Sequence, residues 1–274
     1  MKKLIVLVAA LAALAALLRD RVPPLLLWPA LIALALAPAI FDQLLTAYAD
    51  VPLALTFAVG LTAAGRWLLT NERWALGLAV LAFAGALLTK NEGLLFVVAA
   101  YAGLFVAAFS RRRALAVALL ADALLLLPWR IFMAVHDLHN KDYSLGDSFD
   151  FHHVSGRLGV GPIAFRTLAG QMLDPGQWGL LVPLFVAVVL AAALTGRARP
   201  ALFAAVWAGL SWLGLSWIYV ISHYEYSVYL DSSKARVVAS IVVGSAALTP
   251  LLAAEAWASA RGRGRPRGDA ARTP

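Results

Sequence analysis

The sequence contains no cysteine among its 274 residues, and only 14% of those residues are charged. The absence of cysteine excludes disulfide bonds, thiol nucleophiles and thiolate metal sites. Hydrophobic residues make up 62% of the chain, which leaves too little polar surface for a water-soluble domain of this size. The composition therefore predicts an integral membrane protein, and because the apolar runs are long, an all-α one.

Apolar runs of about 20 residues, the length that crosses ~30 Å of hydrocarbon, recur along the chain. They fall at 23–41, 51–68, 74–89, 93–110, 114–131, 178–196, 200–221 and 236–258, with a shorter run at 4–18. The expected fold is a polytopic bundle of 8–9 transmembrane helices over residues 1–258. It would carry one long outer loop at 132–177 and a disordered basic cytoplasmic tail at 259–274.

The basic residues predict how this bundle is oriented. Basic residues cluster at 19–21, 66–73, 111–113, 197–199 and in the tail, and these clusters alternate along the chain with loops that are poor in Lys and Arg. The positive-inside rule places these clusters in the cytoplasm. The net charge of +8 is then explained by basic residues in the cytoplasmic loops and the tail, so no nucleic-acid partner is expected. All five histidines and the remaining polar stretches would face outwards from a plasma membrane.

The first residues, "MKKLIVLVAALAALAALL", resemble a secretory signal peptide in their lysines and short apolar core. Cleavage after this core would invert every later span and put the basic clusters outside. We therefore expect a short first span whose N-terminus lies outside, in spite of Lys2 and Lys3.

Two of the expected outer loops carry acidic residues and a lysine next to the apolar runs. Asp50 precedes a span, where an acid can simply favour the helix N-terminus or can act chemically. Lys90 and Glu92 form a three-residue turn in "LLTKNEGLLF". They fit a snorkelling ion pair and equally a phosphate-binding site, since lysine is a point-charge ligand for phosphate.

The outer loop is too long for a simple connection, which predicts a functional or interfacial role. Ser155 could cap a helix lying in the headgroup region, with Arg157 and Arg166 directed to lipid phosphates. His152 and His153 have the composition of a metal site, but adjacent histidines on a helix diverge by about 100° and rarely share one metal.

A last outer stretch, "SHYEYSVYLDSSKARVV" at 222–238, crowds ionisable and hydroxyl side chains before the final span. Arg236 opens that span, and an arginine at that depth needs an anion, either a lipid headgroup or a bound ligand.

Five stretches in this order resemble motifs of the polytopic GT-C glycosyltransferases. The similarity is to the bacterial relatives of the protein O-mannosyltransferases and the lipid A aminoarabinose transferases, the glycosyltransferase family 39 type. The stretches are "YADVPLA" (48–54), "TKNEGL" (89–94), "LPWR" (127–130), "DPGQWGLL" (174–181) and "YLDSSKARVV" (229–238). Together they cover about residues 40–250.

The resemblance implies an enzyme that moves a sugar from a polyprenyl-phosphate donor to an acceptor hydroxyl by inverting displacement. The site would face the periplasm of a bacterial inner membrane, among membrane lipids, and the acceptor would be a lipid, a glycan or a protein. Asp50 would be the base or would orient the acceptor, with Glu92 as the second candidate. The residues implied in substrate binding are Tyr48, Lys90, Arg130, His152, His153, Asp231, Ser233 and Arg236. No cofactor is implied, and the use of a divalent metal is left open.

The chain departs from that family at its start. The family's principal acid stands in the first outer loop, and residues 1–40 supply only Asp20, on the expected cytoplasmic side. We therefore expect the chain to lack the family's opening spans, and one alternative is an inactive truncated glycosyltransferase. The other is a non-catalytic transporter or lipid flippase that uses Asp122, in the middle of a span, as a buried relay.

Overall fold

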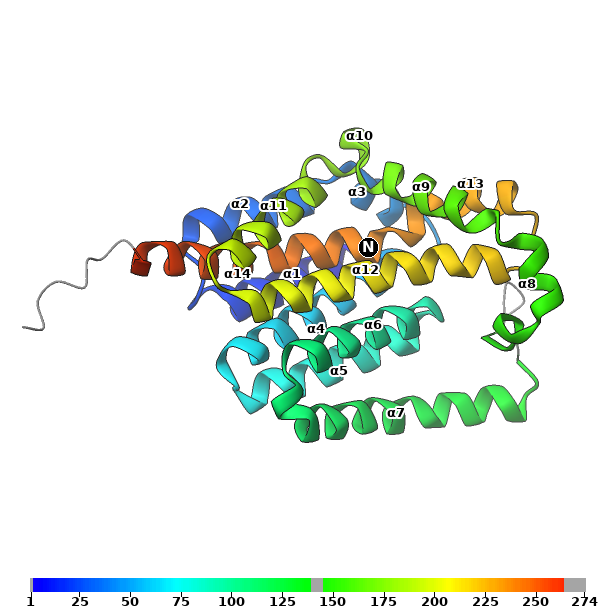
Figure 1. Cartoon of the computed structure of the whole chain (residues 1–274), viewed down its shortest axis with the longest axis horizontal. Helices are drawn as coiled ribbons and strands as arrows, with labels where there is room; N and C mark the ends of the chain where they lie inside the picture. Colours follow the sequence, from blue (N-terminus) through cyan, green and yellow to red (C-terminus); the bar gives the residue numbers. More distant parts are fainter. Residues whose placement is uncertain (1, 139–144, 264–274) are drawn as a thin grey trace, which may run out of the picture.

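A computed structural model describes residues 2–138 and 145–263, and this part of the chain is all-helical (Figure 1). The prediction of an all-α chain is therefore confirmed over these residues. Residues 139–144 of the expected outer loop and 264–274 of the expected tail lie outside the described residues.

The longer helices follow the predicted apolar runs closely. Their bounds are α1 Lys2–Leu18, α2 Pro24–Ala35, α3 Pro38–Leu44, α4 Asp50–Thr70, α5 Arg73–Thr89, α6 Glu92–Ala107, η1 Phe109–Arg111, α7 Arg112–Val135, η2 Leu145–Phe149, α8 Phe151–Arg157, α9 Val160–Met172, α10 Pro175–Trp178, α11 Leu181–Leu194, α12 Ala198–Ile221, α13 Tyr226–Val237 and α14 Ala239–Arg263. Because α14 continues through Arg263, the first residues of the expected tail are helical.

Four helical segments of the described chain are long and apolar enough to cross a membrane. They are α4, η1 with α7, α12, and α13 with α14. The α2–α3 pair, bent by 48°, makes a fifth if it counts as one span. The bend has a covalent cause, since Pro38 begins α3 and has no N–H to continue the preceding helix. Helices α5, α6 and α11 are also apolar but shorter, and the set as a whole is compatible with a membrane protein.

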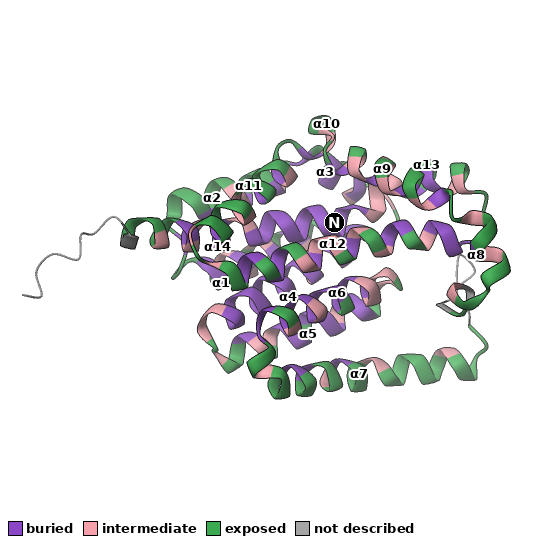
Figure 2. Ribbon diagram, in the orientation of Figure 1, coloured by how far each residue is buried: buried purple, intermediate pink, exposed green. Residues whose placement is uncertain are grey.

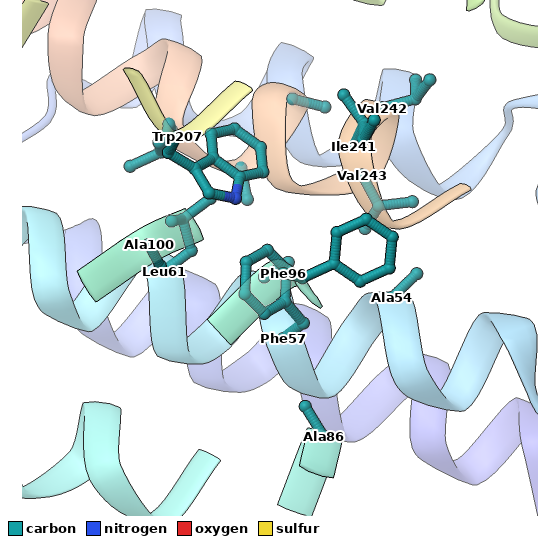
Figure 3. Close-up of a cluster of buried hydrophobic side chains, with 14 of the residues drawn as sticks. Ala54, Phe57, Leu61, Ala86, Phe96, Ala100, Trp207, Ile241, Val242 and Val243 are labelled. Atoms are coloured by element: carbon teal, nitrogen blue, oxygen red, sulfur yellow. The ribbon is translucent and has the colours of Figure 1, made fainter. Parts of the chain in front are cut away.

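Helix α4 forms the centre of the bundle and packs against α5 and α14. Phe57 of this helix lies 5.6 Å from Phe83, 5.7 Å from Phe96 and 5.8 Å from Trp207, measured between ring centroids. Figure 3 shows Phe57, Phe96 and Trp207 converging from three helices with Val243 of α14 beside them. Each such aromatic pair adds about 0.5–1.5 kcal/mol to the burial of its apolar surface. This cluster therefore fixes α4, α5, α6 and α12 relative to one another.

Helix α7 stands at the edge of the bundle, and most of its surface is exposed (Figure 2). Only 17% of its most apolar stretch is buried, compared with 83% for α4. An apolar helix with so little protein around it has the surface expected of a helix that faces lipid.

An ionic cluster, here called the Arg66 clamp, closes one end of the bundle. The Arg66 guanidinium donates to both carboxylate oxygens of Asp20, at 2.7 and 2.8 Å, and to Glu72 at 2.8 Å. It also donates to the Leu17 carbonyl at 2.6 Å, and its side chain is only 7% exposed. Asp50 begins the same helix, and the helical rise of 1.5 Å per residue puts it about 24 Å away along the axis. The two ends are called the Asp50 end and the Arg66 end.

Candidate functional site

Three of the residues predicted to be functional meet at the Asp50 end. The Lys90 ammonium lies 2.7 Å from Oδ1 of Asp50 and 3.0 Å from Oε1 of Glu92. The side chains of Asp50 and Glu92 are 4% and 12% exposed, so both carboxylates are largely removed from solvent. A lysine placed between two buried carboxylates offsets part of the cost of removing their charges from water.

Two further predicted residues complete this group. Nη1 of Arg236 is 3.8 Å from Oδ2 of Asp50, and its guanidinium carbon lies 3.8 Å from the centre of the Tyr48 ring. The stacking on Tyr48 is a cation–π contact that leaves the edge of the guanidinium plane available. We call Tyr48, Asp50, Lys90, Glu92 and Arg236 the Asp50 cluster.

The turn between α5 and α6 is tightly constrained by a glycine. A Cβ on Gly93 would lie 2.4 Å from the backbone oxygen of Ala86, so only glycine allows the two helices to approach this closely. Lys90 leaves α5 with extended backbone angles, and Glu92 begins α6. The short turn therefore holds both side chains against the first turn of α4.

The charges of the Asp50 cluster stabilise one another. Burial lowers the pKa of Lys90, but the neighbouring carboxylates of Glu92 and Asp50 outweigh burial and raise its pKa overall. Lys90 therefore stays protonated at neutral pH. The cluster has two carboxylates and two cations, so it is close to neutral as a whole.

Two polar atoms of the cluster are buried without a hydrogen-bond partner among the described residues. They are Oδ2 of Asp50 and Nε of Arg236. The 3.8 Å between Asp50 Oδ2 and the nearest Arg236 nitrogen is too long for a hydrogen bond. The Asp50 cluster thus contains one buried acceptor and one buried donor without partners, and such atoms call for an explanation, for which a ligand is one candidate.

Lys3 and Gln43 also belong to the Asp50 end, and sequence reasoning did not select either of them. The Lys3 ammonium donates to the carbonyls of Gln43, at 3.0 Å, and of Thr46. The side-chain amide of Gln43 donates to the Ala235 carbonyl at 3.1 Å, which ties α3 to α13. The one signal in the sequence was that Lys3 did not fit the positive-inside rule on the outer side. In the structure its charge is balanced by backbone carbonyls at the C-terminal end of α3.

Ser233 is buried, and its contacts hold α13 in place. Its hydroxyl donates to the Tyr229 carbonyl at 2.5 Å and lies 2.7 Å from the Tyr219 hydroxyl. The rings of Tyr219 and Tyr229 are 5.2 Å apart. These contacts fix the turn of α13 from which Arg236 projects.

Four predicted site residues lie apart from the Asp50 cluster. Asp231 is exposed and pairs with Lys234 at 2.7 Å. Arg130 is exposed on α7, and His152 is exposed in the first turn of α8. His153 faces His223, with 5.0 Å between the ring centroids. In the described part of the chain, no group of three or more His, Asp or Glu side chains could hold a metal ion.

The outer loop folds differently from the prediction. Ser155 lies inside α8, and α9, the helix that it was expected to cap, begins at Val160 without a side-chain cap. The cap of α8 is Asp150, which accepts from the backbone N–H groups of His152 and His153. These bonds lower the pKa of Asp150. Arg157 does not extend to lipid, because it donates to the carbonyls of Tyr219 and Tyr224 at 3.2 and 3.0 Å. The charged side chain finds backbone acceptors at the end of α12 that sequence alone could not locate.

Comparisons with known proteins give no relative for this chain. No protein-family model, no curated protein and no solved structure matches it. Function is therefore inferred from the residues of the Asp50 end.

Replacing Lys90 with methionine is expected to lower the stability of the protein. The substitution leaves the buried carboxylates of Asp50 and Glu92 without their nearest cation, and a hydrogen bond to a charged group contributes about 1.5–3 kcal/mol. The expected fall in Tm is roughly 4–8 °C, measured by thermal unfolding in detergent.

The matched control for Lys90→Met is Lys234→Met, which breaks an exposed pair and is expected to cost less than about 1 kcal/mol. Adding Asp50→Asn to Lys90→Met removes one unpaired charge and should restore much of the lost Tm. Equal shifts for the two lysine variants would contradict the structural role given to Lys90.

Proposed function

We propose that this chain is a GT-C-like glycosyltransferase that moves a sugar from a polyprenyl-phosphate donor to an acceptor hydroxyl. On this proposal the apolar helices α1, α4 to α7, α11, α12 and α14, with the α2–α3 pair, are nine spans. The Asp50 end faces the periplasm of a bacterial inner membrane, and the Arg66 end faces the cytoplasm. The basic joints at the Arg66 end support this orientation.

The observation that carries the proposal is the free oxygen of a buried carboxylate beside two cations. Asp50 Oδ1 is held by Lys90, which leaves Oδ2 free to accept a proton. Arg236 and Lys90 lie on either side of that carboxylate. A proton acceptor and two phosphate-binding cations are what transfer from a phosphorylated lipid requires.

The chemistry follows in one displacement. The acceptor hydroxyl oxygen attacks the anomeric carbon of the donor sugar, and the bond from that carbon to the phosphate oxygen breaks with inversion. The hydroxyl proton passes to Asp50 Oδ2. The polyprenyl phosphate leaves with the bonding electrons, and Lys90 and Arg236 stabilise the charge that develops on it.

The test is a transfer assay on the full chain reconstituted in lipid vesicles. A panel of polyprenyl-phosphate sugars, each with a mixture of lipid and glycan acceptors, is supplied, and release of polyprenyl phosphate is measured. Release with at least one donor, dependent on an added acceptor, is the expected result. A protein that is folded and inserted but releases none with any donor would overturn the proposal.

A second candidate function rests on Asp122. The Tyr101 hydroxyl donates to Oδ2 of Asp122 at 2.6 Å, and Oδ1 is buried with no partner among the described residues. An acid within a span is a candidate relay for a transporter or flippase. It lies on α7 and pairs with α6, away from the contacts of the Asp50 cluster.

Asp122→Asn separates the two candidate functions. Because the side-chain amide of this variant would keep a hydrogen-bond acceptor for Tyr101, the fold should be retained. A glycosyltransferase is expected to keep its transfer rate within about threefold, since general-base effects of 10²–10⁴ belong to the base itself. The second candidate would be favoured by two results together: wild type releases no polyprenyl phosphate, and Asp122→Asn loses a transport or lipid-flipping activity that wild type shows in the same vesicles.

A further inference from the structure

We propose that a pocket at the Arg66 end binds a phosphate-bearing anion, independently of the chemistry at the Asp50 end. The pocket has a volume of about 390 Å³ and lies where the last turn of α4 meets the joint between α11 and α12. Its walls include two apolar side chains, Leu68 and Leu69, and three arginines, Arg111, Arg197 and Arg199. A volume of this size lies within the range of small-ligand sites.

Arg111 is held in a fixed orientation at the pocket. One of its nitrogens, Nη1, donates to the carbonyls of Trp67 and Leu68 at 3.3 and 3.1 Å. Its guanidinium carbon lies 5.4 Å from the centre of the Trp67 ring. A guanidinium carries five N–H donors, so these contacts orient Arg111 and leave donors for a ligand.

The joint between α11 and α12 supplies backbone donors to the same pocket. Gly196 has a φ of 86°, a value that glycine adopts without strain, and it turns the chain so that α12 begins at the pocket. The first N–H groups of a helix lack acceptors within the helix, and they carry its positive partial charge. Ala198 and Arg199 present such groups beside the pocket, which is a favourable site for phosphate.

The ion pair between Arg197 and Glu255 limits the positive charge of this pocket. Nε of Arg197 lies 3.4 Å from Oε2 of Glu255, and this nitrogen is buried without a hydrogen-bond partner among the described residues. Glu255 neutralises part of the charge of Arg197, whereas Arg111 and Arg199 form no ion pair with the described part of the chain. The net field of the pocket is positive.

The chemistry therefore selects a phosphate with an apolar or neutral substituent that can contact Leu68 and Leu69. The headgroup of an anionic phospholipid has this chemistry, and so does a soluble phosphate ester. Basic pockets between membrane helices on the cytoplasmic side commonly hold such headgroups. The two sources share one recognition chemistry and differ in whether acyl chains are needed.

The experiment measures binding of short-chain phosphatidylglycerol, short-chain phosphatidylcholine and glycerol phosphate to the full chain in neutral detergent. Arg199→Gln is the main variant, because Arg199 is exposed and its loss should not disturb folding. We expect it to weaken binding of the anionic ligand about 5- to 10-fold. Ala198→Trp, which fills the pocket without changing charge, should weaken binding as well.

The matched control is Arg113→Gln, an exposed arginine two residues after Arg111 that does not line the pocket. Tight binding of phosphatidylglycerol alone would identify a lipid headgroup, and equal binding of glycerol phosphate would identify a soluble ligand. Equal weakening by Arg199→Gln and Arg113→Gln, with no effect of Ala198→Trp, would show general surface attraction and overturn the proposal. None of these outcomes depends on sugar transfer.

Discussion

An Asp50→Asn variant should insert and fold normally while its rate of sugar transfer falls by about 10²–10⁴-fold, the range that a general base supplies. The amide keeps the size of the side chain and can still accept from Lys90, whose second partner, Glu92, is unchanged. It cannot take the proton of the acceptor hydroxyl at neutral pH. The measurement is the rate of polyprenyl phosphate release, with the Tm as the index of folding.

The control for Asp50→Asn is Asp42→Asn, an exposed acid at the same end of the bundle that contributes nothing to the Asp50 cluster. Its transfer rate should equal that of wild type. A wild-type rate in Asp50→Asn would remove Asp50 from the mechanism. In that case Glu92→Gln becomes the test of the remaining buried acid.

The largest expected effect on stability is that of Arg66→Gln. Arg66 is 7% exposed and donates to two carboxylates and to one carbonyl, so the substitution removes several charge-assisted hydrogen bonds at once. Asp20 and Glu72 are partly exposed and can be rehydrated, which limits the loss to about 2–3 kcal/mol. The expected fall in Tm is roughly 4–10 °C. Arg73→Gln, an exposed neighbour, should leave Tm nearly unchanged.

The pH dependence of stability gives a second readout of the same clamp. Hydrogen bonds from Arg66 lower the pKa of Asp20 and of Glu72 below their ordinary values of 3.8 and 4.5. Both carboxyls bind fewer protons in the folded protein, so their contribution is fully present above those values. It is lost as the pH falls through the lowered pKa values. Arg66→Gln should therefore flatten the decline in Tm below about pH 4, and an unchanged decline would contradict the clamp.

Most of the helices could be predicted from the sequence because long apolar runs leave the backbone no other way to satisfy its hydrogen bonds in a membrane. The prediction also placed Asp20, Arg66 and Glu72 at one end, and they meet there. The bend between α2 and α3 was missed, although Pro38 carried a signal for it. The exact partners in each contact depend on packing between distant segments, which local patterns do not encode.

In the Asp50 cluster, too, the residues could be predicted from the sequence but their contacts could not. Asp50, Lys90 and Glu92 could be selected because charged residues at the ends of apolar runs are conspicuous. The 2.7 Å contact between Lys90 and Asp50 follows from the closeness of α4 and α5, which depends on neighbours such as Phe57 and Phe83. Arg130 was selected by resemblance alone, and α7 carries it at the edge of the bundle.

Helix α4 is fastened at both of its ends, by Lys90 and Arg236 at one and by Asp20 and Glu72 at the other. A slide of one helical turn, about 5.4 Å, would break both sets of ion pairs together. We therefore expect α4 to stay stationary through any working cycle. Opening and closing would be left to helices with little protein around them, such as α7, whose most apolar stretch is only 17% buried.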